Sequence, residues 1–379
     1  MVSEVSAKAP GKILWLGGYS VLERPNISLV TAVDAYVTVN LKTRTDQAIE
    51  LNAPQLKMSA KGFVDRNSGK LDANTPKELL LLKTAAEVAF RYASGIGKEV
   101  PGLRITTNSD AAFAYGISAG KIVKSGLGSS AAVTVATACA VLKALGINPE
   151  EKDALHKLSQ TAHSIATGKV GSGFDIAAAS FGSILYTRYS PEIVKKLPAN
   201  YSNKQLVDLV NKKWDYIIEK FSLPDEFRLL FANFGESMIT TKAIGNVSEF
   251  KEKDPHVYSD IIGEINDENM MAVNALRELK GGNKDALEGF RNAFDSGRSL
   301  TKKLGVLSNV AIEPDDCTEL IAESKKNGAF VAKLPGAGGK DAIAALSVGR
   351  ESQESLRKFW KAKKELNLLD INAISDGAI

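Results

Sequence analysis

Residues 124–146 read KSGLGSSAAVTVATACAVLKALG. Most of this stretch is rich in alanine and apolar on nearly every face, which predicts a helix that is buried all round. Gly146 provides a stop for that helix, because glycine commonly follows a helix C-terminus. The turn before it, GLGSS at residues 126–130, combines two glycines with two hydroxyl side chains. The stretch therefore predicts a glycine-rich turn that leads directly into a buried helix.

The composition of this turn suits a polyphosphate ligand. Gly126 and Gly128 carry no Cβ, so a ligand can approach the backbone closely. The free N–H groups of the first helical turn point outward and carry partial positive charge. Ser129 and Ser130 add hydroxyl groups for a phosphate or a metal ion. A helix cap without any ligand has the same composition, so the turn alone leaves both interpretations open.

Two other phosphate-binding motifs do not fit. GLGSSA at residues 126–131 matches G-x-G-x-x-A, but that motif expects an acid after a strand about 20 residues further on. Glu150 and Glu151 instead stand at a predicted helix start. Residues 116–121, GISAGK, come close to a P-loop, but the segment is one residue short and Ile122 replaces serine or threonine.

The bulk composition is that of an ordinary globular protein. The 48 lysines and arginines barely exceed the 44 aspartates and glutamates, which argues against a nucleic-acid partner and allows only a local positive pocket. No segment has the length and apolarity of a membrane span. Residues 1–12 lack the apolar core of a signal peptide. Two cysteines, Cys139 and Cys317, form no disulfide framework, so a cytoplasmic protein is expected.

Strand and helix signals alternate along the rest of the chain. Apolar and polar residues alternate over residues 36–41, which predicts a strand. Thr75, with Pro76 and Glu78 after it, fits the N-cap of a helix that ends at Gly95. Further strands are predicted at residues 13–22, 103–107, 184–189, 227–234, 329–336, 342–348 and 368–374, and further helices from Asn148–Pro149 to Gly168, within residues 241–326 and at residues 355–366.

The chain divides by composition into two parts. Residues 190–225 are richer in lysine and asparagine, which indicates a linker with a surface helix. A chain of 379 residues has room for two or three domains. Two α+β domains are therefore predicted, at residues 1–190 and 191–379.

Three more glycine-containing segments carry candidate functional residues. KAPGK at residues 8–12 places a lysine beside a tight turn before an apolar strand, where it can neutralise an anion, although a solvated lysine fits too. GKVGSGFD at residues 168–175 presents Asp175, which is either a reactive acid or a plain N-cap. KLPGAGGKD at residues 333–341 places glycines between two strands, as in a ligand loop or a hairpin turn.

The order of these motifs resembles the GHMP kinases, the family of galactokinase, homoserine kinase, mevalonate kinase and phosphomevalonate kinase. The resemblance runs from residue 8 to about residue 346. Within the family, finer details are similar to the phosphomevalonate kinases. These details are GGYSVLE at residues 17–23, where mevalonate kinases have G-E-H, the continuous block at residues 162–183, and IEP at residues 312–314.

The resemblance implies a two-domain GHMP kinase fold of the α+β class. Its N-terminal domain is ribosomal-S5-like, its C-terminal domain is ferredoxin-like, and the active site lies in the cleft between them. Lys12 and Asp175 are the implied catalytic residues. The implied ATP-binding residues are Gly126, Leu127, Gly128, Ser129, Ser130 and Ala131, and Ser130 is also the implied Mg²⁺ ligand. The implied substrate-binding residues are Lys8, Tyr19, Lys169, Ser172, Gly173, Gly336, Ala337, Gly338 and Gly339.

One position departs from the mevalonate kinase pattern. His163 stands where mevalonate kinases have a glutamate that helps to bind Mg²⁺. Histidine is a poor ligand for Mg²⁺, which prefers oxygen. Either serine, phosphates and water hold the metal, or another carboxylate substitutes, and His163 is structural or contacts phosphate. Gly18, at another mevalonate kinase glutamate position, likewise weakens that alternative.

The reaction implied by the resemblance is ATP-dependent phosphorylation of 5-phosphomevalonate to 5-diphosphomevalonate, a step of isoprenoid biosynthesis in the mevalonate pathway. A phosphate nucleophile is already ionised at neutral pH, so neutralising charge matters more than removing a proton. Lys12, Lys169 and Mg²⁺ fit that task, and Asp175 would orient Lys12 or take a residual proton. A mevalonate kinase, which needs Asp175 as a true base, is the main alternative, and a GHMP-fold protein that binds without catalysis is another. A monomer and a homodimer are both compatible with the sequence.

Overall fold

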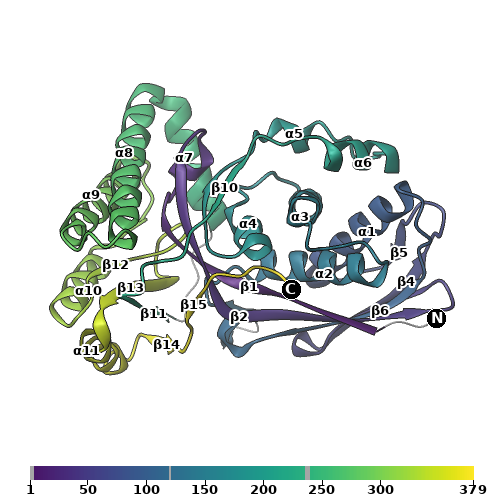
Figure 1. The fold of residues 1–379 in the computed structure, drawn as a ribbon, viewed down its shortest axis with the longest axis horizontal. Helices are drawn as coiled ribbons and strands as arrows, with labels where there is room; N and C mark the ends of the chain where they lie inside the picture. The colour runs from purple at the N-terminus through teal and green to yellow at the C-terminus, as the bar shows by residue number, and fades with distance from the viewer. Residues whose placement is uncertain (1–3, 119–120, 235–239) are drawn as a thin grey trace.

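The computed structural model describes residues 4–118, 121–234 and 240–379. Its longest strands, β1 (Glu4–Leu16) and β2 (Ile27–Arg44), pair antiparallel. Apolar and polar residues alternate in the second half of β2, so its buried side chains face one side of the sheet, as the sequence predicts. This pair lies at the centre of the larger of the two main sheets (Figure 1).

The larger sheet has nine strands and is centred on β2. Its order is β10-β9-β2-β6-β3-β4-β5, and β1 and β15 also pair with β2. Residues 29–33 of β2 are all buried, because helices α4 and α8 pack against this part of the strand. The other strands of this sheet are β3 (Ala48–Ala53), β4 (Met58–Val64), β5 (Leu71–Ala73), β6 (Gly102–Ser109), β9 (Ile184–Thr187), β10 (Ile217–Lys220) and β15 (Ala373–Ile374).

Helices cover one face of the larger sheet (Figure 1). The central one, α2, packs against β1, β2, α1 and α3 and is buried over most of its length, which confirms the predicted all-round buried helix. Cys139 lies in its buried part. The helices of this layer are α1 (Leu80–Gly95), α2 (Ser129–Ala144), α3 (Lys152–Thr167), α4 (Phe174–Phe181), α5 (Glu192–Lys195) and α6 (Asn203–Asn211).

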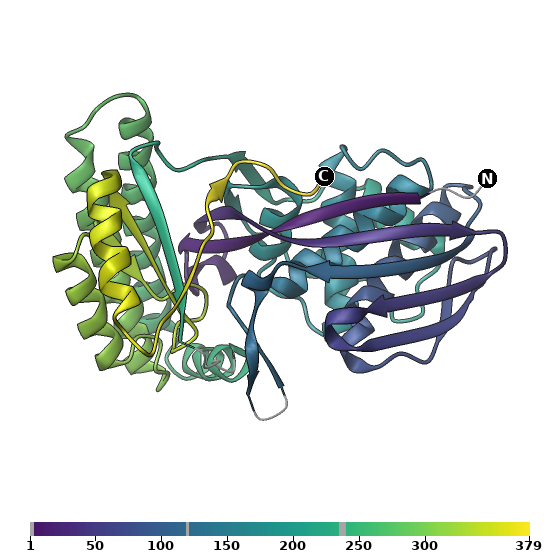
Figure 2. The ribbon, with the colours of Figure 1, turned by 90° about the horizontal axis from the view of Figure 1, so that it is seen from below.

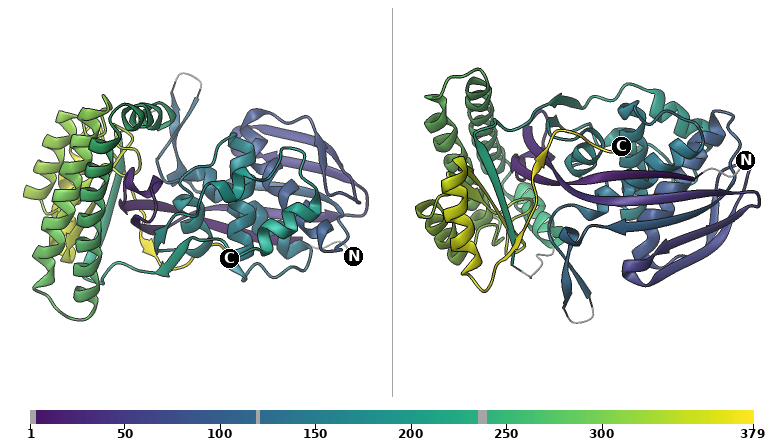
Figure 3. Two further views of the ribbon diagram at one scale, coloured as in Figure 1. Left: turned by 90° about the horizontal axis from the view of Figure 1, so that it is seen from above. Right: turned by 60° about the horizontal axis from the view of Figure 1, so that its bottom comes forward.

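A smaller sheet of four strands, in the order β12-β13-β11-β14, forms a second body. Figures 2 and 3 show helices α9, α10 and α11 on the side of this sheet that faces away from the larger sheet. Its strands are β11 (Phe227–Asn233), β12 (Val331–Lys333), β13 (Ala342–Val348) and β14 (Asn367–Leu369). Its helices are α7 (Thr240–Lys253), α8 (Pro255–Lys280), α9 (Ala286–Leu307), α10 (Asp315–Lys326) and α11 (Gly349–Lys361).

Short elements complete the fold. A hairpin of β7 (Ala114–Ser118) and β8 (Lys121–Lys124) projects from the larger body (Figure 2), and Ala119 and Gly120 of the rejected P-loop segment lie outside the described residues. The 3₁₀ turns are η1 (Ser20–Leu22), η2 (Pro54–Leu56), η3 (Lys77–Leu79) and η4 (Ala111–Phe113). Among the described residues, no helix has the length and apolarity to cross a membrane.

The C-terminal segment crosses from one sheet to the other. After β14 in the smaller sheet, the chain reaches the larger sheet, where Asn372 is hydrogen-bonded to the Asp34 carboxylate through its backbone N–H (2.6 Å) and its side chain (2.8 Å). β15 then pairs with β2. Ile379 exchanges two backbone hydrogen bonds with Lys8, at 2.9 and 3.0 Å. The predicted single strand at residues 368–374 is therefore wrong, since it consists of two short strands in different sheets.

The α+β fold class is confirmed, and three further element boundaries differ from the sequence prediction. The strand expected to reach residue 22 ends at Leu16, because Gly17 and Tyr19 take positive φ angles of 95° and 60°. The capping box at Thr75 is wrong: its hydroxyl donates to the Ala73 carbonyl (2.9 Å), and a 3₁₀ turn precedes α1.

The helix predicted to open at Asn148–Pro149 begins instead at Lys152. The Asn148 side chain accepts a hydrogen bond from the Glu150 N–H (3.0 Å), which makes a local turn before the helix. The division of the chain into domains at residue 190 stays a prediction. Two strands that follow residue 190 in the sequence, β10 and β15, belong to the larger sheet.

Candidate active site

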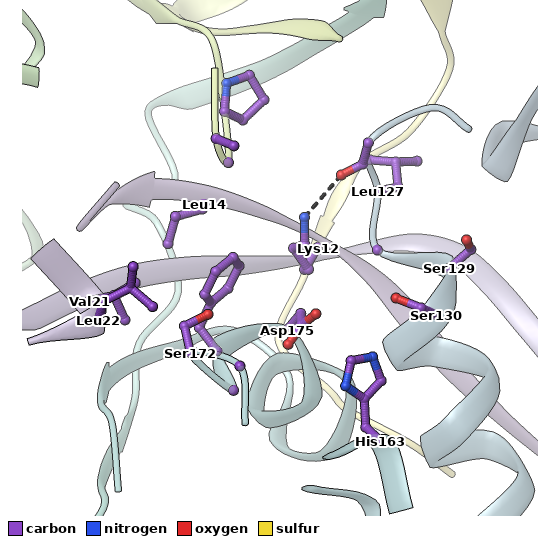
Figure 4. A pocket seen from close by; sticks show the side chains of 18 of the residues that line it. Lys12, Leu14, Val21, Leu22, Leu127, Ser129, Ser130, His163, Ser172 and Asp175 are labelled. Carbon is purple, nitrogen blue, oxygen red and sulfur yellow. Dashed lines mark hydrogen bonds between the residues drawn. The ribbon is translucent and has the colours of Figure 1, made fainter. Parts of the chain in front are cut away.

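A cavity of about 450 Å³ lies where the two sheets meet. Segments far apart in sequence line it. They include β1 and the turn after it, the GLGSS turn with the start of α2, the end of α3, the loop into α4, and the loop between β12 and β13. Figure 4 shows Lys12 at the centre, the two serines of the turn on one side and Ser172 on the other. The fold therefore brings the glycine-containing segments of the sequence together around one space.

The GLGSS turn has the geometry that its glycines allow. Gly126 and Gly128 have φ angles of 78° and 83°, which side-chain-bearing residues rarely adopt. A Cβ on Gly128 would lie 2.9 Å from Lys12 Cε, so glycine is also needed for space. Ser129 and Ser130 open α2, and both line the cavity. This helix start thus presents backbone N–H groups and two hydroxyls to a ligand.

Lys12 is almost fully buried at the centre of the cavity. Its backbone N–H donates to the Leu127 carbonyl (2.9 Å), and its Nζ donates to the Gly126 carbonyl (2.9 Å). Burial lowers the pKa of Lys12, and the negative charges of Asp175 and Asp341 oppose that shift. The ammonium group is therefore fixed against the GLGSS turn with two carboxylates nearby.

Asp175 is the second residue of α4 and lies close to Lys12 and His163 (Figure 4). Its Oδ1 accepts a hydrogen bond from the N–H of Ile176 (2.9 Å), which leaves the other carboxylate oxygen for a second contact. His163, on α3, also lines the cavity. The sequence prediction that the glycine loop presents this acid to a ligand is consistent with this placement.

Sequence reasoning missed a second acid, Asp341, which lies directly before β13. Its Oδ2 lies 3.3 Å from the position of a Cβ on Gly126, and its Oδ1 is buried with no hydrogen-bond partner among the described residues. Burial raises the pKa of Asp341, and Lys12 opposes the shift. The signal in the sequence is an acid two residues after a glycine cluster, which is the pattern that singled out Asp175.

The loop between β12 and β13 closes the cavity from the smaller sheet. The Tyr19 hydroxyl donates to the Ala337 carbonyl (2.9 Å), and burial raises the pKa of Tyr19 to about 12. Gly336 and Ala337 line the cavity. A neutral tyrosine hydroxyl thus joins the loop to the turn after β1.

Four of the predicted site residues do not line the cavity: Lys8, Ala131, Gly338 and Gly339. Lys8 lies over the ring of Tyr36, with Nζ 4.2 Å from the ring centre. Ala131 is buried behind the turn. The two glycines contact the backbone of Ile312, to which the Gly339 N–H donates at 2.8 Å, so they anchor the loop. The other predicted site residues are Lys12, Tyr19, Gly126, Leu127, Gly128, Ser129, Ser130, Lys169, Ser172, Gly173, Asp175, Gly336 and Ala337, and all of them line the cavity.

Oxygen atoms suited to a divalent cation surround the same space. Among the described residues, no three histidine, cysteine or acidic side chains form a metal cluster. The cavity nevertheless contains the hydroxyls of Ser129 and Ser130 and the carboxylates of Asp175 and Asp341. Mg²⁺ prefers few protein oxygens together with substrate phosphates and water, so this donor set fits Mg²⁺ and does not fit a closed protein cage.

Comparisons with known proteins agree with this geometry. A family model described as the GHMP kinase N-terminal domain matches residues 80–183, which span α1 to α4. A phosphomevalonate kinase from Saccharolobus solfataricus is 30% identical over 369 residues, covering 97% of this chain and 96% of that protein. A peroxisomal phosphomevalonate kinase from Arabidopsis thaliana is 28% identical, covering 96% of this chain and 94% of that protein.

A solved structure has the same fold. Streptococcus pneumoniae phosphomevalonate kinase, in complex with phosphomevalonate and AMPPNP, superposes with a TM-score of 0.77 at 19% identity and covers 98% of this chain and 100% of that one. The sequence relatives cover nearly the whole chain, and the structural match includes both sheets. On this evidence the chain is a member of the phosphomevalonate kinase family within the GHMP kinases.

Proposed function

We propose that this protein transfers the γ-phosphoryl group of ATP to the phosphate of 5-phosphomevalonate, giving 5-diphosphomevalonate and ADP. The observation that carries the proposal is the position of Lys12. Its ammonium group contacts the GLGSS turn on one side and faces the loop of residues 169–175 on the other, within one cavity. Two phosphate-bearing substrates can therefore meet at one buried cation.

The GLGSS turn is the proposed site of the ATP phosphates. The open N-terminus of α2 supplies N–H groups, and the left-handed glycines let the triphosphate approach the backbone. Ser130, with Ser129 and an acid beside it, would hold Mg²⁺. When bound, Mg²⁺ neutralises phosphate charge during transfer.

The acceptor is proposed to bind between Lys12 and the loop that carries Lys169 and Ser172. Its phosphate carries about −1.5 to −2 charges at neutral pH, so it is already nucleophilic and needs little base catalysis. An acceptor oxygen forms the new bond to the γ-phosphorus as the bond to the bridging oxygen of ADP breaks. The task of the protein is to hold two anions in line, because positioning and charge neutralisation carry most of such catalysis.

Lys12 and Asp175 have distinct tasks in this scheme. Lys12 stabilises the negative charge shared by both phosphates, which is why its burial close to two carboxylates matters: they oppose the loss of its proton. Asp175 holds the ammonium in place or takes a residual proton from a monoprotonated acceptor. Mevalonate would instead require Asp175 to remove a hydroxyl proton, and that acceptor stays the alternative.

An assay of ADP release tests the proposal directly. Purified protein is given ATP and Mg²⁺ with mevalonate, 5-phosphomevalonate or 5-diphosphomevalonate, and kcat/KM is compared. The expected result is turnover of 5-phosphomevalonate well above the other two. Faster turnover of mevalonate would overturn the proposed acceptor, and no turnover of any acceptor would support a binding protein without catalysis. A cytoplasmic location and a monomeric or homodimeric state stay predictions from the sequence.

A further inference from the structure

The loop before α4 is held through four consecutive carbonyl groups. Arg188 Nη2 donates to the carbonyls of Val170 (3.3 Å) and Gly171 (2.7 Å). The next two carbonyls, of residues 172 and 173, accept from the Tyr186 hydroxyl (3.1 Å) and from Gln160 Nε2 (2.7 Å). The donors come from α3, from β9 and from the residue that follows β9, so these elements together hold residues 170–173 of the loop.

Among these donors, Arg188 is buried and binds three carbonyl groups. Its side chain is 7% exposed and does not line the cavity. A third bond, from its Nη1 to the Leu22 carbonyl (2.8 Å), joins the loop to η1, a neighbouring segment that also lines the cavity. Arg24 donates to the Arg188 carbonyl (2.5 Å) and forms an ion pair with Asp215 (2.9 Å), which fixes the backbone of Arg188.

This arrangement decides which groups the loop shows to a ligand. In a trans peptide the C=O and the following N–H point in opposite directions. Because the carbonyls of residues 170–173 point back to Arg188, Tyr186 and Gln160, the N–H groups of residues 171–174 point away from those donors. Arg188 and Tyr186 do not line the cavity, so the carbonyls of residues 170–172 turn the negative ends of their peptide dipoles away from a ligand there. The N-terminus of α4 follows directly after the loop.

We propose that Arg188 is a positioning residue that shapes this loop for the anionic acceptor. The inference rests on the proposed function, since it takes the acceptor to be a phosphate ester. Arginine suits the position because two separate nitrogens of its rigid planar fork reach three carbonyls, whereas a lysine would have to reach them from a single nitrogen. Among the described residues Arg188 forms no ion pair, so its positive charge also adds to the potential at the loop.

The test compares Arg188→Lys and Arg188→Met with matched changes at Arg91. Arg91 is equally buried, and it donates to the Tyr201 carbonyl and to Asn203 (3.1 Å) between α1 and α6. Wild-type turnover of 5-phosphomevalonate is measured first. Its absence would reject the proposed function, whereas the KM values of the variants test the role of Arg188 in an active enzyme. The KM values of acceptor and ATP, kcat and the melting temperature are then measured for each variant.

The expected result is a separation of the two KM values. Arg188→Lys raises the acceptor KM by about tenfold, the effect of one lost charge-assisted hydrogen bond, and Arg188→Met raises it further. The ATP KM stays within about twofold, and the Arg91 variants lower the melting temperature without changing the acceptor KM. If Arg188→Met does not fold, Tyr186→Phe, which frees only the carbonyl of residue 172, replaces it. Equal shifts of both KM values, or an unchanged acceptor KM, would overturn the proposal.

Discussion

Replacing Gly128 by alanine tests whether the position of Lys12 depends on the turn above it. Gly128 has a φ of 83°, and in this left-handed region an alanine costs roughly 1–2 kcal/mol of folding free energy. Its Cβ would lie 2.9 Å from Lys12 Cε, whereas carbon atoms prefer a separation of about 3.5–4.0 Å. The lysine side chain must therefore move by roughly half an ångström or more, and its 2.9 Å bond to the Gly126 carbonyl is lost or lengthened.

A displacement of that size at the reacting centre matters for the rate. A misplacement of about 1 Å can cost on the order of 10²-fold in rate, so a fall in kcat between tenfold and a hundredfold is expected for Gly128→Ala. The matched control is Gly146→Ala at the other end of α2. Gly146 has a φ of 64°, but nothing lies within 4 Å of its Cβ position, so it carries the backbone cost without the contact.

The assay is steady-state ADP release at saturating ATP and acceptor, with the melting temperature of each variant as the measure of stability. Gly146→Ala is expected to lose stability and keep its kcat, and Gly128→Ala is expected to lose both. If both variants keep wild-type kcat, the reasoning that Lys12 must occupy this position is refuted.

Four further changes test individual side chains. Asp175→Asn should lower kcat by at least about 10²-fold while ATP still binds, and activity within a few-fold of wild type would reduce Asp175 to a helix cap. Ser130→Ala should raise the ATP KM or the Mg²⁺ requirement with little change in folding, and titrations of both ligands measure this. Lys169→Ala should weaken acceptor binding by roughly 1.5–3 kcal/mol and ATP binding much less; equal shifts in the two KM values would place Lys169 at the nucleotide. Asp341→Asn removes a carboxylate that raises the pKa of Lys12, so the ammonium loses its proton at lower pH. The high-pH limb of kcat/KM should then move to lower pH, and an unmoved limb would contradict the electrostatic role.

The parts of the fold that were predicted correctly have strong local signals. Helix α2 is apolar on all sides, and the alternation at residues 36–41 fixes which face of β2 is buried. The errors arose where a local signal competed with a contact made elsewhere. Thr75 has the sequence of an N-cap, yet Pro76 is extended, with ψ at 149°, so the helix starts later. The C-terminal strand is divided because Asp34 binds Asn372, a contact that no local pattern announces.

The candidate site was predictable where glycine motifs mark it. The GLGSS turn, Lys12 and Asp175 were singled out because each stands in a short motif with a physical reason, and the structure places them around one cavity. Asp341 and Arg188 were not singled out because the contacts that suggest a role for them are made with distant residues: Asp341 lies beside Gly126, and Arg188 donates to the carbonyls of residues 170 and 171. Contacts between residues so far apart in the sequence can be recognised only from the folded structure.

The crossing of the C-terminal segment has a consequence for how the molecule melts. β14 belongs to the smaller sheet and β15 to the larger one, so the chain passes between the two bodies once after β10 and again just before its last residues. Loss of the smaller sheet would release β15 from β2 and expose the central strand of the larger sheet, so the two bodies are expected to lose their structure together. A single cooperative calorimetric peak is therefore expected, even though the ribbon shows two bodies (Figure 3).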